Sequence, residues 1–176
     1  MDFFDYWEQR KLGEIGEIIT GSTPSTINSE YYSTKGIPWV TPTDIIDNIT
    51  YSTEKSLSIL GEKVSRVTPK DTILVTCIAS IGKNTLLGTR GSFNQQINAL
   101  VANNKYFNPY FLLIDSYNWS TEMKSRASSG TMQIVNKKEF SNISTNVPKI
   151  NEQIIIGNIF YKFDNLITLH QRKHFP

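Results

Sequence analysis

The pattern of apolar positions divides the chain into a strand-rich first part and a helical second part. In the first hundred residues, short stretches rich in β-branched residues are bounded by Gly, Pro, Asn or Ser, which is typical of strands. These stretches are residues 15–20, 37–41, 72–78 and 96–102. Clusters of Gly, Ser, Thr and Pro at 21–25 and 41–43 predict loops between them.

Helical spacing takes over after residue 107. Asn108 suits an N-cap and Pro109 suits the first helical position, and apolar residues follow at steps of three and four as far as Tyr117. We expect this helix to end before residues 128–130. A loop and a short polar segment at 136–142 follow, and residues 143–147 alternate like a strand that stops at Pro148.

The last element is predicted to be a long helix from Asn151 to about Lys173, because this stretch has no proline and a continuous apolar stripe. At 1.5 Å per residue it would be roughly 34 Å long. A small β domain cannot cover such a helix along its whole length, so the stripe needs a second long helix. The alternative is a terminal helix folded back over its own core. The stripe consists of Ile156, Ile159, Phe163, Leu166 and His170, widened by Ile155, Phe160 and Ile167.

Length and composition agree with one compact domain and an appendage. The chain has 176 residues, which suits one domain plus an appendage. Together with the apolar pattern, this predicts a mixed, strand-rich α+β domain at 1–148 followed by a spacer helix at 149–176. No apolar run approaches the roughly 20 residues that span a bilayer, and residues 1–10 do not resemble a signal peptide, so we expect no membrane partner and a cytoplasmic protein. The single cysteine, Cys77, lies in an apolar stretch and is expected to be a buried, inert thiol.

The charge distribution favours a polyanion-binding surface in the middle of the chain. Residues 1–54 carry 3 basic and 9 acidic side chains, whereas residues 55–138 carry 11 basic and 4 acidic ones. Lys and Arg that neutralise phosphates release condensed counterions, which gives sequence-independent affinity for nucleic acid. The alternative is an ordinary solvated surface.

Catalytic patterns are weak or incomplete in this sequence. Residues 79–84 resemble a phosphate-binding loop but lack its leading Gly and the Ser or Thr after Lys83. Asp115, Glu122 and Lys124 imitate the metal cluster of many nucleases, yet all three fall on one predicted helix, where a solvated face is the simpler interpretation. His170 and His174 could share a metal, but no third ligand is near. We therefore expect no catalysis, no metal site and no cofactor in this chain.

Two polar clusters remain as candidates for DNA binding, since Arg, Asn and Gln can contact base edges and Lys can contact phosphates. For Asn94, Gln95 and Gln96, the alternative is that the amides cap buried backbone groups. The first cluster contains Lys83, Asn84, Arg90 and Gln96, and the second contains Lys124, Arg126, Ser129, Gly130, Thr131, Gln133 and Lys137.

An ordered set of short motifs resembles the target-recognition domain of type I restriction-modification specificity subunits. No single motif is specific, but their order and spacing match the family from residue 7 to 173. The motifs are Trp-Glu-Gln-Arg-Lys-Leu-Gly-Glu at 7–14, Gly-Ser-Thr-Pro-Ser at 21–25, Gly-Ile-Pro-Trp-Val at 36–40, Ser-Phe-Asn-Gln-Gln-Ile at 92–97, Ser-Gly-Thr at 129–131, and Pro148-x-x-x-Glu152-Gln153-x-x-Ile156.

The resemblance implies two tandem units, each a mixed α/β recognition domain followed by a long helix, with the two helices packed antiparallel as a spacer. It also implies partners: double-stranded DNA, a modification subunit that carries S-adenosylmethionine, and a restriction subunit that carries ATP hydrolysis and cleavage. Only one unit is present here. Either two copies form a homodimer, or the chain is a truncated remnant, or a partner chain supplies the second half.

Two rival functions stay open. A stand-alone nuclease would use Asp115 and Glu122. A pure interaction protein would act through the apolar stripe of the last helix alone.

Overall fold

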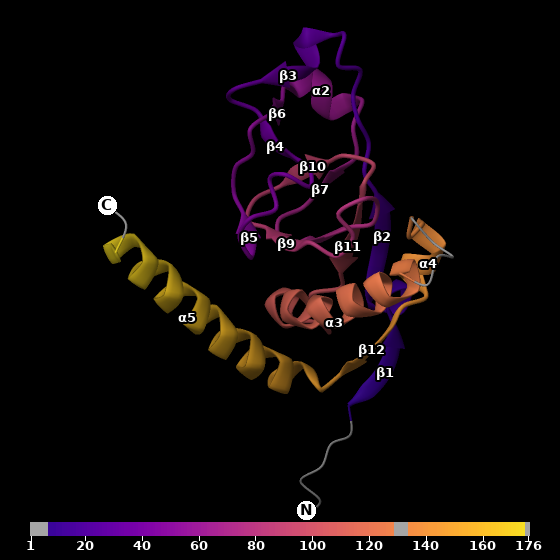
Figure 1. The fold of residues 1–176 in the computed structure, drawn as a ribbon, viewed down its shortest axis with the longest axis vertical. Coiled ribbons are helices and arrows are strands. Elements are labelled where there is room, and N and C mark those ends of the chain that lie inside the picture. The colour runs from indigo at the N-terminus through magenta and orange to yellow at the C-terminus, as the bar shows by residue number, and fades with distance from the viewer. Residues whose placement is uncertain (1–6, 129–133, 175–176) are drawn as a thin grey trace, which may run out of the picture.

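Two five-stranded sheets form the body of the protein, and a long helix extends from it (Figure 1). This computed structural model describes residues 7–128 and 134–174, with side chains at 7–125 and 134–170. We use "the body" for the described residues up to 148. The fold class predicted from the sequence, a strand-rich α+β domain with a long terminal helix, is confirmed.

The first sheet is made of short strands in the order β3-β6-β4-β10-β7. Most are only two residues long, which is below the length at which alternation can be recognised in a sequence. The strands are β3 (Tyr32–Ser33), β4 (Ile37–Val40), β6 (Ser56–Leu57), β7 (Val67–Thr68) and β10 (Gly91–Phe93), accompanied by the 3-10 helix η1 (Ser29–Tyr31) and helix α2 (Ile59–Lys63).

The second sheet has the order β2-β11-β8-β9-β5 and contains the longer strands. Strand β11 lies between β2 and β8 and pairs antiparallel with both. Its strands are β2 (Gly16–Thr20), β5 (Ile49–Thr50), β8 (Ile73–Thr76), β9 (Asn84–Leu87) and β11 (Ile97–Ala102). Three of the predicted strands correspond to β2, β8 and β11, and the fourth to β4.

The hydrophobic core has two parts. One joins the sheets, with Val40 and Phe93 of the first sheet against Leu74 and Leu87 of the second. The other lies between the second sheet and helix α3 (Pro109–Ser128), whose Trp119 is 1% exposed. Cys77 belongs to this second core, and burial raises the pKa of its thiol to about 11, as expected for an inert thiol.

Helix α3 begins where the sequence predicts. The side chain of Asn108 accepts a hydrogen bond from the backbone N–H of Phe111 at 2.9 Å, so Asn108 caps the helix that starts at Pro109. Helix α1 (Leu12–Ile15) and helix α4 (Lys137–Ser141) pack near it, and β1 (Glu8–Lys11) pairs antiparallel with β12 (Ser144–Val147). The segment predicted only as polar is therefore helix α4, with Asn136 and Glu139 as its capping box.

Helix α5 (Ile150–His174) begins after β12 and runs past α3, and its C-terminal end extends beyond the body (Figure 1). Only its first turns are anchored in the core: Gln153 is buried and Ile156 packs against the second core. No helix within the described ranges is long and apolar enough to cross a membrane.

Candidate nucleic-acid interface

Polar loops that are far apart in the sequence meet at one end of the second sheet. The N–H of Gly21 donates to the carbonyl of Ile97 at 3.0 Å, which places the loop after β2 beside the loop before β11. The N–H of Cys77 donates to the carbonyl of Gln96 at 2.7 Å, and the N–H of Val135 donates to the carbonyl of Cys77 at 2.9 Å. The loops at 21–25, 94–96, 77–83 and the start of the segment from 134 therefore form one surface, which we call the sheet-end surface.

Two lysines from different elements come together at this surface. Gly82 has φ of +80°, and a Cβ built there would lie 2.9 Å from Cε of Lys124, so the stem of Lys124 lies directly against the loop that carries Lys83. Nζ of Lys83 donates to the carbonyl of Pro42 at 3.0 Å. Among the described side chains, no carboxylate forms an ion pair with either lysine. Both lysines are exposed, so their charges are available to an anionic ligand.

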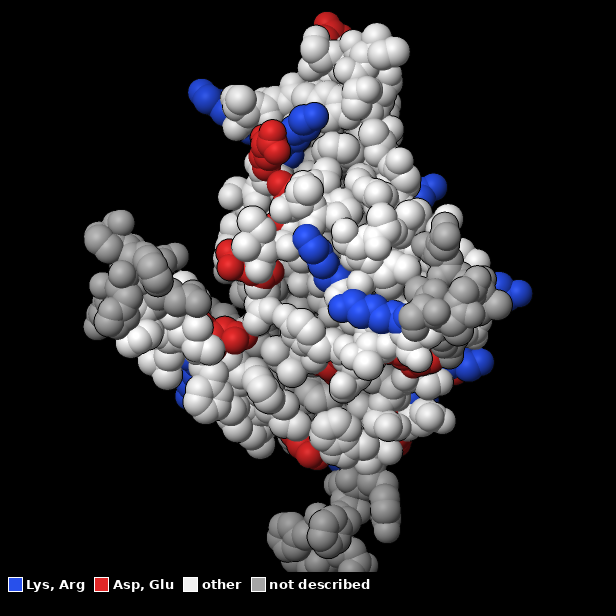
Figure 2. Space-filling model, in the orientation of Figure 1, with Lys and Arg blue, Asp and Glu red and all other residues white. Residues whose placement is uncertain are grey.

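Basic side chains occupy the middle of the face drawn in Figure 2, above the place of α3 in Figure 1. Several acidic side chains lie toward α5 on the same face. On this face, basic side chains thus lie apart from the acidic ones beside α5.

Asn84 must be withdrawn from the predicted DNA contacts. It is the first residue of β9 and only 6% exposed, and its Oδ1 accepts a hydrogen bond from the hydroxyl of Ser120 at 2.9 Å. All four residues of β9 are buried, because α3 covers one face of this strand and the first sheet lies on the other side. Because both faces of β9 are covered, the side chain of Asn84 cannot reach the surface.

Arg90 does not join the predicted cluster either. It follows β9, whereas Lys83 precedes that strand, so the two side chains lie at opposite ends of it. The guanidinium of Arg90 instead forms an ion pair with Glu62 of α2 at 2.7 Å. Lys83 and Arg90 are close in the sequence, but strand β9 separates them in space.

The amide groups before β11 combine both interpretations that the sequence left open. Asn94 is 8% exposed, and its Oδ1 accepts from the backbone N–H of Gln96 at 3.1 Å, so this amide does cap backbone. Its Nδ2 donates to Oε1 of Gln96 at 3.0 Å, which holds the half-buried Gln96 in place. Gln95 is exposed, and its Oε1 accepts from the hydroxyl of Thr23. Gln96 and Gln95 therefore lie on the sheet-end surface.

Sequence reasoning did not single out Arg66, which also reaches this surface. Its guanidinium donates to the carbonyl of Thr20 at 2.5 Å and its backbone N–H donates to the hydroxyl of Ser22 at 3.0 Å. Arg66 is exposed, so its remaining N–H groups face solvent beside Gln95 and the loop at 21–25. No local pattern marks Arg66, because its partners are more than 40 residues away in the sequence.

The rest of the second predicted cluster can be placed only in part. Lys124 and Lys137 are exposed, and Lys137 begins α4 shortly after the segment that joins the sheet-end surface. Arg126 lies on α3, but its side chain is outside the described residues. Ser129, Gly130, Thr131 and Gln133 also lie outside the described residues.

The acidic residues considered for a nuclease site are structural or scattered. Oδ2 of Asp115 accepts from the indole N–H of Trp119 at 2.9 Å and from the hydroxyl of Thr145, which ties α3 to β12. Glu122 lies two turns further along the same helix, as expected. Within residues 7–128 and 134–174, no three His, Cys, Asp or Glu side chains are grouped so that they could hold a metal ion.

The chemistry of the site is thus that of a polar, basic binding surface. The model of one protein family, the type I restriction modification DNA specificity domain, matches residues 5–174. The chain belongs to this family. The match extends over nearly the whole chain and confirms the resemblance drawn from the ordered motifs.

Curated relatives of this specificity domain are type I specificity subunits. It is 29% identical over 147 residues to the HindI specificity subunit of Haemophilus influenzae, covering 81% of this chain and 32% of that protein. It is 28% identical over 180 residues to the MjaIX specificity subunit of Methanocaldococcus jannaschii, covering 96% and 40%. The chain therefore spans about two fifths or less of these relatives.

A solved structure confirms the fold of the specificity domain. The HsdS subunit from Thermoanaerobacter tengcongensis superposes with a TM-score of 0.71 at 19% identity, over 98% of this chain and 41% of that one. At this identity the likeness concerns the fold alone.

The apolar stripe predicted for the last helix of the specificity domain is largely uncovered. Ile156 packs against the core, but Ile159, Phe163 and Leu166 are 47%, 57% and 62% exposed, and His170 is exposed as well. A helix folded back over its own core would bury these residues, so that alternative is wrong beyond the first turns. Beyond Ile156, the described chain leaves the stripe about half exposed or more.

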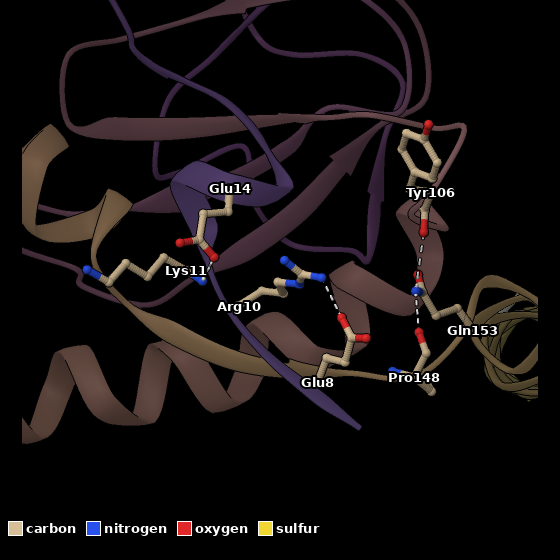
Figure 3. A network of polar contacts seen from close by, with 7 residues as sticks. All are labelled: Glu8, Arg10, Lys11, Glu14, Tyr106, Pro148 and Gln153. Carbon is tan, nitrogen blue, oxygen red and sulfur yellow. Dashed lines mark hydrogen bonds and ion pairs between the residues drawn. The ribbon is translucent and has the colours of Figure 1, made fainter. Parts of the chain in front are cut away.

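The base of helix α5 is fixed by one buried amide (Figure 3). Gln153 is 1% exposed, and its Nε2 donates to the carbonyl of Pro148 at 2.7 Å and to that of Tyr106 at 3.4 Å. Its Oε1 accepts from the backbone N–H of Asn108 at 2.9 Å. The Pro-x-x-x-Glu-Gln motif thus joins the start of α5 to the segment that leads into α3.

Replacing Gln153 with Ala is expected to lower the free energy of unfolding by about 3 kcal/mol, because buried N–H and carbonyl groups lose their partner. Urea unfolding measures this loss. Asn158→Ala, on an exposed position of the same helix, is the matched control and should cost less than about 0.5 kcal/mol. Equal, small losses in both variants would contradict the anchoring role.

Proposed function

We propose that this chain reads a short DNA half-site for a type I restriction-modification complex and does not itself catalyse a reaction. The observation that carries the proposal is the sheet-end surface. It brings three basic side chains, Lys83, Lys124 and Arg66, together with several amide and hydroxyl groups at one end of a sheet, in a chain of the DNA specificity domain family. Phosphate contacts give affinity and amide or guanidinium contacts give sequence preference, and this surface offers both.

The residues divide by chemistry into two roles. Lys83, Lys124 and Lys137 would contact phosphates and fix the register on the duplex, since an ammonium group acts as a point charge. Gln95, Gln96 and Arg66 would face base edges in the major groove, since amides pair with adenine and guanidinium with guanine. The proposed interface also includes five residues on the sequence argument alone: Arg126, Ser129, Gly130, Thr131 and Gln133.

The uncovered stripe of α5 supports a protein partner. A second copy of this chain would supply a matching helix and a second recognition domain, so that two half-sites are read across a gap. A modification subunit would dock on the paired helices and carry S-adenosylmethionine, and a restriction subunit would join for cleavage. These partners place the chain with the DNA, in the cytoplasm.

A DNA-binding selection tests this function. Random duplexes are offered to the purified chain at about 100 mM salt, with and without the modification subunit, because affinity for DNA has meaning only at a stated salt concentration. A short motif repeated with twofold symmetry across a fixed gap is expected. Tight binding of the modification subunit with no enriched motif in either condition would support the interaction-protein alternative and remove the proposal.

A further inference from the structure

A polar junction joins α5 to the body at Asp164. Nδ2 of Asn48, in the loop before β5, donates to Oδ2 of Asp164 at 2.7 Å. The hydroxyl of Tyr110, on α3, donates to the same oxygen. The hydroxyl of Tyr117, about two turns further along α3, donates to Oδ1 of Asn48 at 2.6 Å. One carboxylate therefore ties the spacer helix to two separate elements of the body.

The junction lies well beyond the buried base of the helix. At the base, Gly157 approaches Asn108 and Phe111 so closely that a Cβ would lie 2.6 Å from Oδ1 of Asn108. Asp164 is seven residues further on, which is about 10 Å along a helix. A rod held at one point can pivot about it, whereas a rod held at two points about 10 Å apart has a defined direction.

Beside Asp164, the packing between the helix and the body is open. A cleft of about 440 Å³ opens between α5 and the loop before β5, lined by Ile46 and Asp47 on one side and by Ile167 and Thr168 on the other. Ile46 is 84% exposed and Ile167 is 54% exposed, so the cleft is not packed. Asp164 and its partners Asn48 and Tyr110 also line this cleft, and Tyr110 makes an edge-to-face contact with Tyr161 at 5.2 Å between ring centroids.

The protonation of the donors is secure. Burial raises the pKa of Tyr110 far above its ordinary value, and the hydrogen bond and negative charge of Asp164 raise it further. Burial and the charge of Asp164 also raise the pKa of Tyr117. Both phenols thus stay protonated near neutral pH and keep donating to the junction.

We propose that Asp164 is a positioning residue that sets the angle between α5 and the body, and with it the gap between the two half-sites that a paired assembly can read. This inference rests on the proposed function. A change of 10° on a lever of about 30 Å, the length of a 20-residue helix, displaces the recognition domain by about 5 Å. One base pair rises about 3.4 Å, so even this small rotation changes the gap by more than one base pair.

Three full-length variants separate the junction from the helix itself. Asp164→Ala removes the acceptor, and Asp164→Asn keeps an acceptor oxygen of the same shape. Asn158→Ala makes an equivalent truncation on an exposed position of α5. Each variant goes through the DNA-binding selection, and the half-site sequence and the gap length are scored separately.

All variants should enrich the same half-site sequence as the wild type. The wild type, Asp164→Asn and Asn158→Ala are expected to enrich one gap length. Asp164→Ala is expected to spread enrichment over at least two or three neighbouring gap lengths. A single unchanged gap in Asp164→Ala, with a clear motif, would overturn the proposal and leave the proposed function standing.

A distance measurement tests the same proposal without DNA. Spin labels on Lys55→Cys in the body and Leu169→Cys on α5 report the angle, with excess unlabelled chain present so that only distances within one chain are measured. Cys77 is 2% exposed and should not be labelled. Asp164→Ala should broaden the distance distribution, and Asp164→Asn should keep it narrow. An unbroadened distribution in Asp164→Ala would refute the proposal even if the wild type enriched no motif and the proposed function failed.

Discussion

Reversing the charge of Lys83 and Lys124 together, each to Glu, is expected to lower the affinity of the chain for any duplex by about 100-fold at 100 mM salt. Both lysines are exposed and lie side by side at the sheet-end surface. Two lost phosphate contacts should also reduce the slope of log affinity against log salt by about 2. Fluorescence anisotropy with a labelled duplex at several salt concentrations measures both quantities.

The matched control reverses two lysines at the opposite end of the same sheet. Lys70 precedes β8 and Lys105 follows β11, and both are exposed. The double variant Lys70→Glu, Lys105→Glu changes net charge by the same amount but should alter affinity by less than about 5-fold, since exposed charges beyond a Debye length are screened. Similar losses for both pairs would mean that binding follows net charge and would remove the sheet-end surface as the site.

The second large effect is expected on α5. Phe163→Asp should weaken pairing of this helix by about 1,000-fold, because an unpaired charge buried in a helical seam costs several kcal/mol. Phe163 is 57% exposed in the single chain, so the free energy of unfolding of the chain itself should hardly change. Light scattering at several concentrations measures self-association, and a pull-down with the modification subunit measures docking.

Asn158→Asp is the control, because it adds the same charge to an exposed position of α5 outside the stripe. It should leave both kinds of association within a few-fold of the wild type. If Phe163→Asp paired as well as this control, the stripe would not be the seam and the second recognition domain would have to be held in another way.

Most of the fold could be predicted from the sequence, because its main helices and longer strands have strong local signals. Asn108 and Pro109 mark the start of α3, and the stripe of α5 predicts a helix that its own domain cannot cover. The Asn136 and Glu139 capping box of α4 was also available in the sequence, although the short segment was interpreted only as polar. Strands of two residues, such as β5 and β7, leave no periodic pattern at all.

The site was harder to predict because it is assembled from distant segments. Asn84 and Arg90 were grouped with Lys83 by nearness in sequence, but a buried strand hides the first and carries the second to the other end of the sheet. Arg66 and Asp164 have no local signal, since their partners come from the loop at 20–22 and from Asn48. Tertiary packing of the sheets and helices brings such residues together.

The measurement that tests the central claim most directly is the ratio of two affinities at one salt concentration. The chain, with its modification subunit, is titrated with a duplex carrying the selected motif and with one in which the half-site bases are scrambled. A sequence-reading domain should prefer the motif by about 1,000-fold or more. A ratio near one would show that the sheet-end surface binds the DNA backbone without reading its sequence, and would contradict the account.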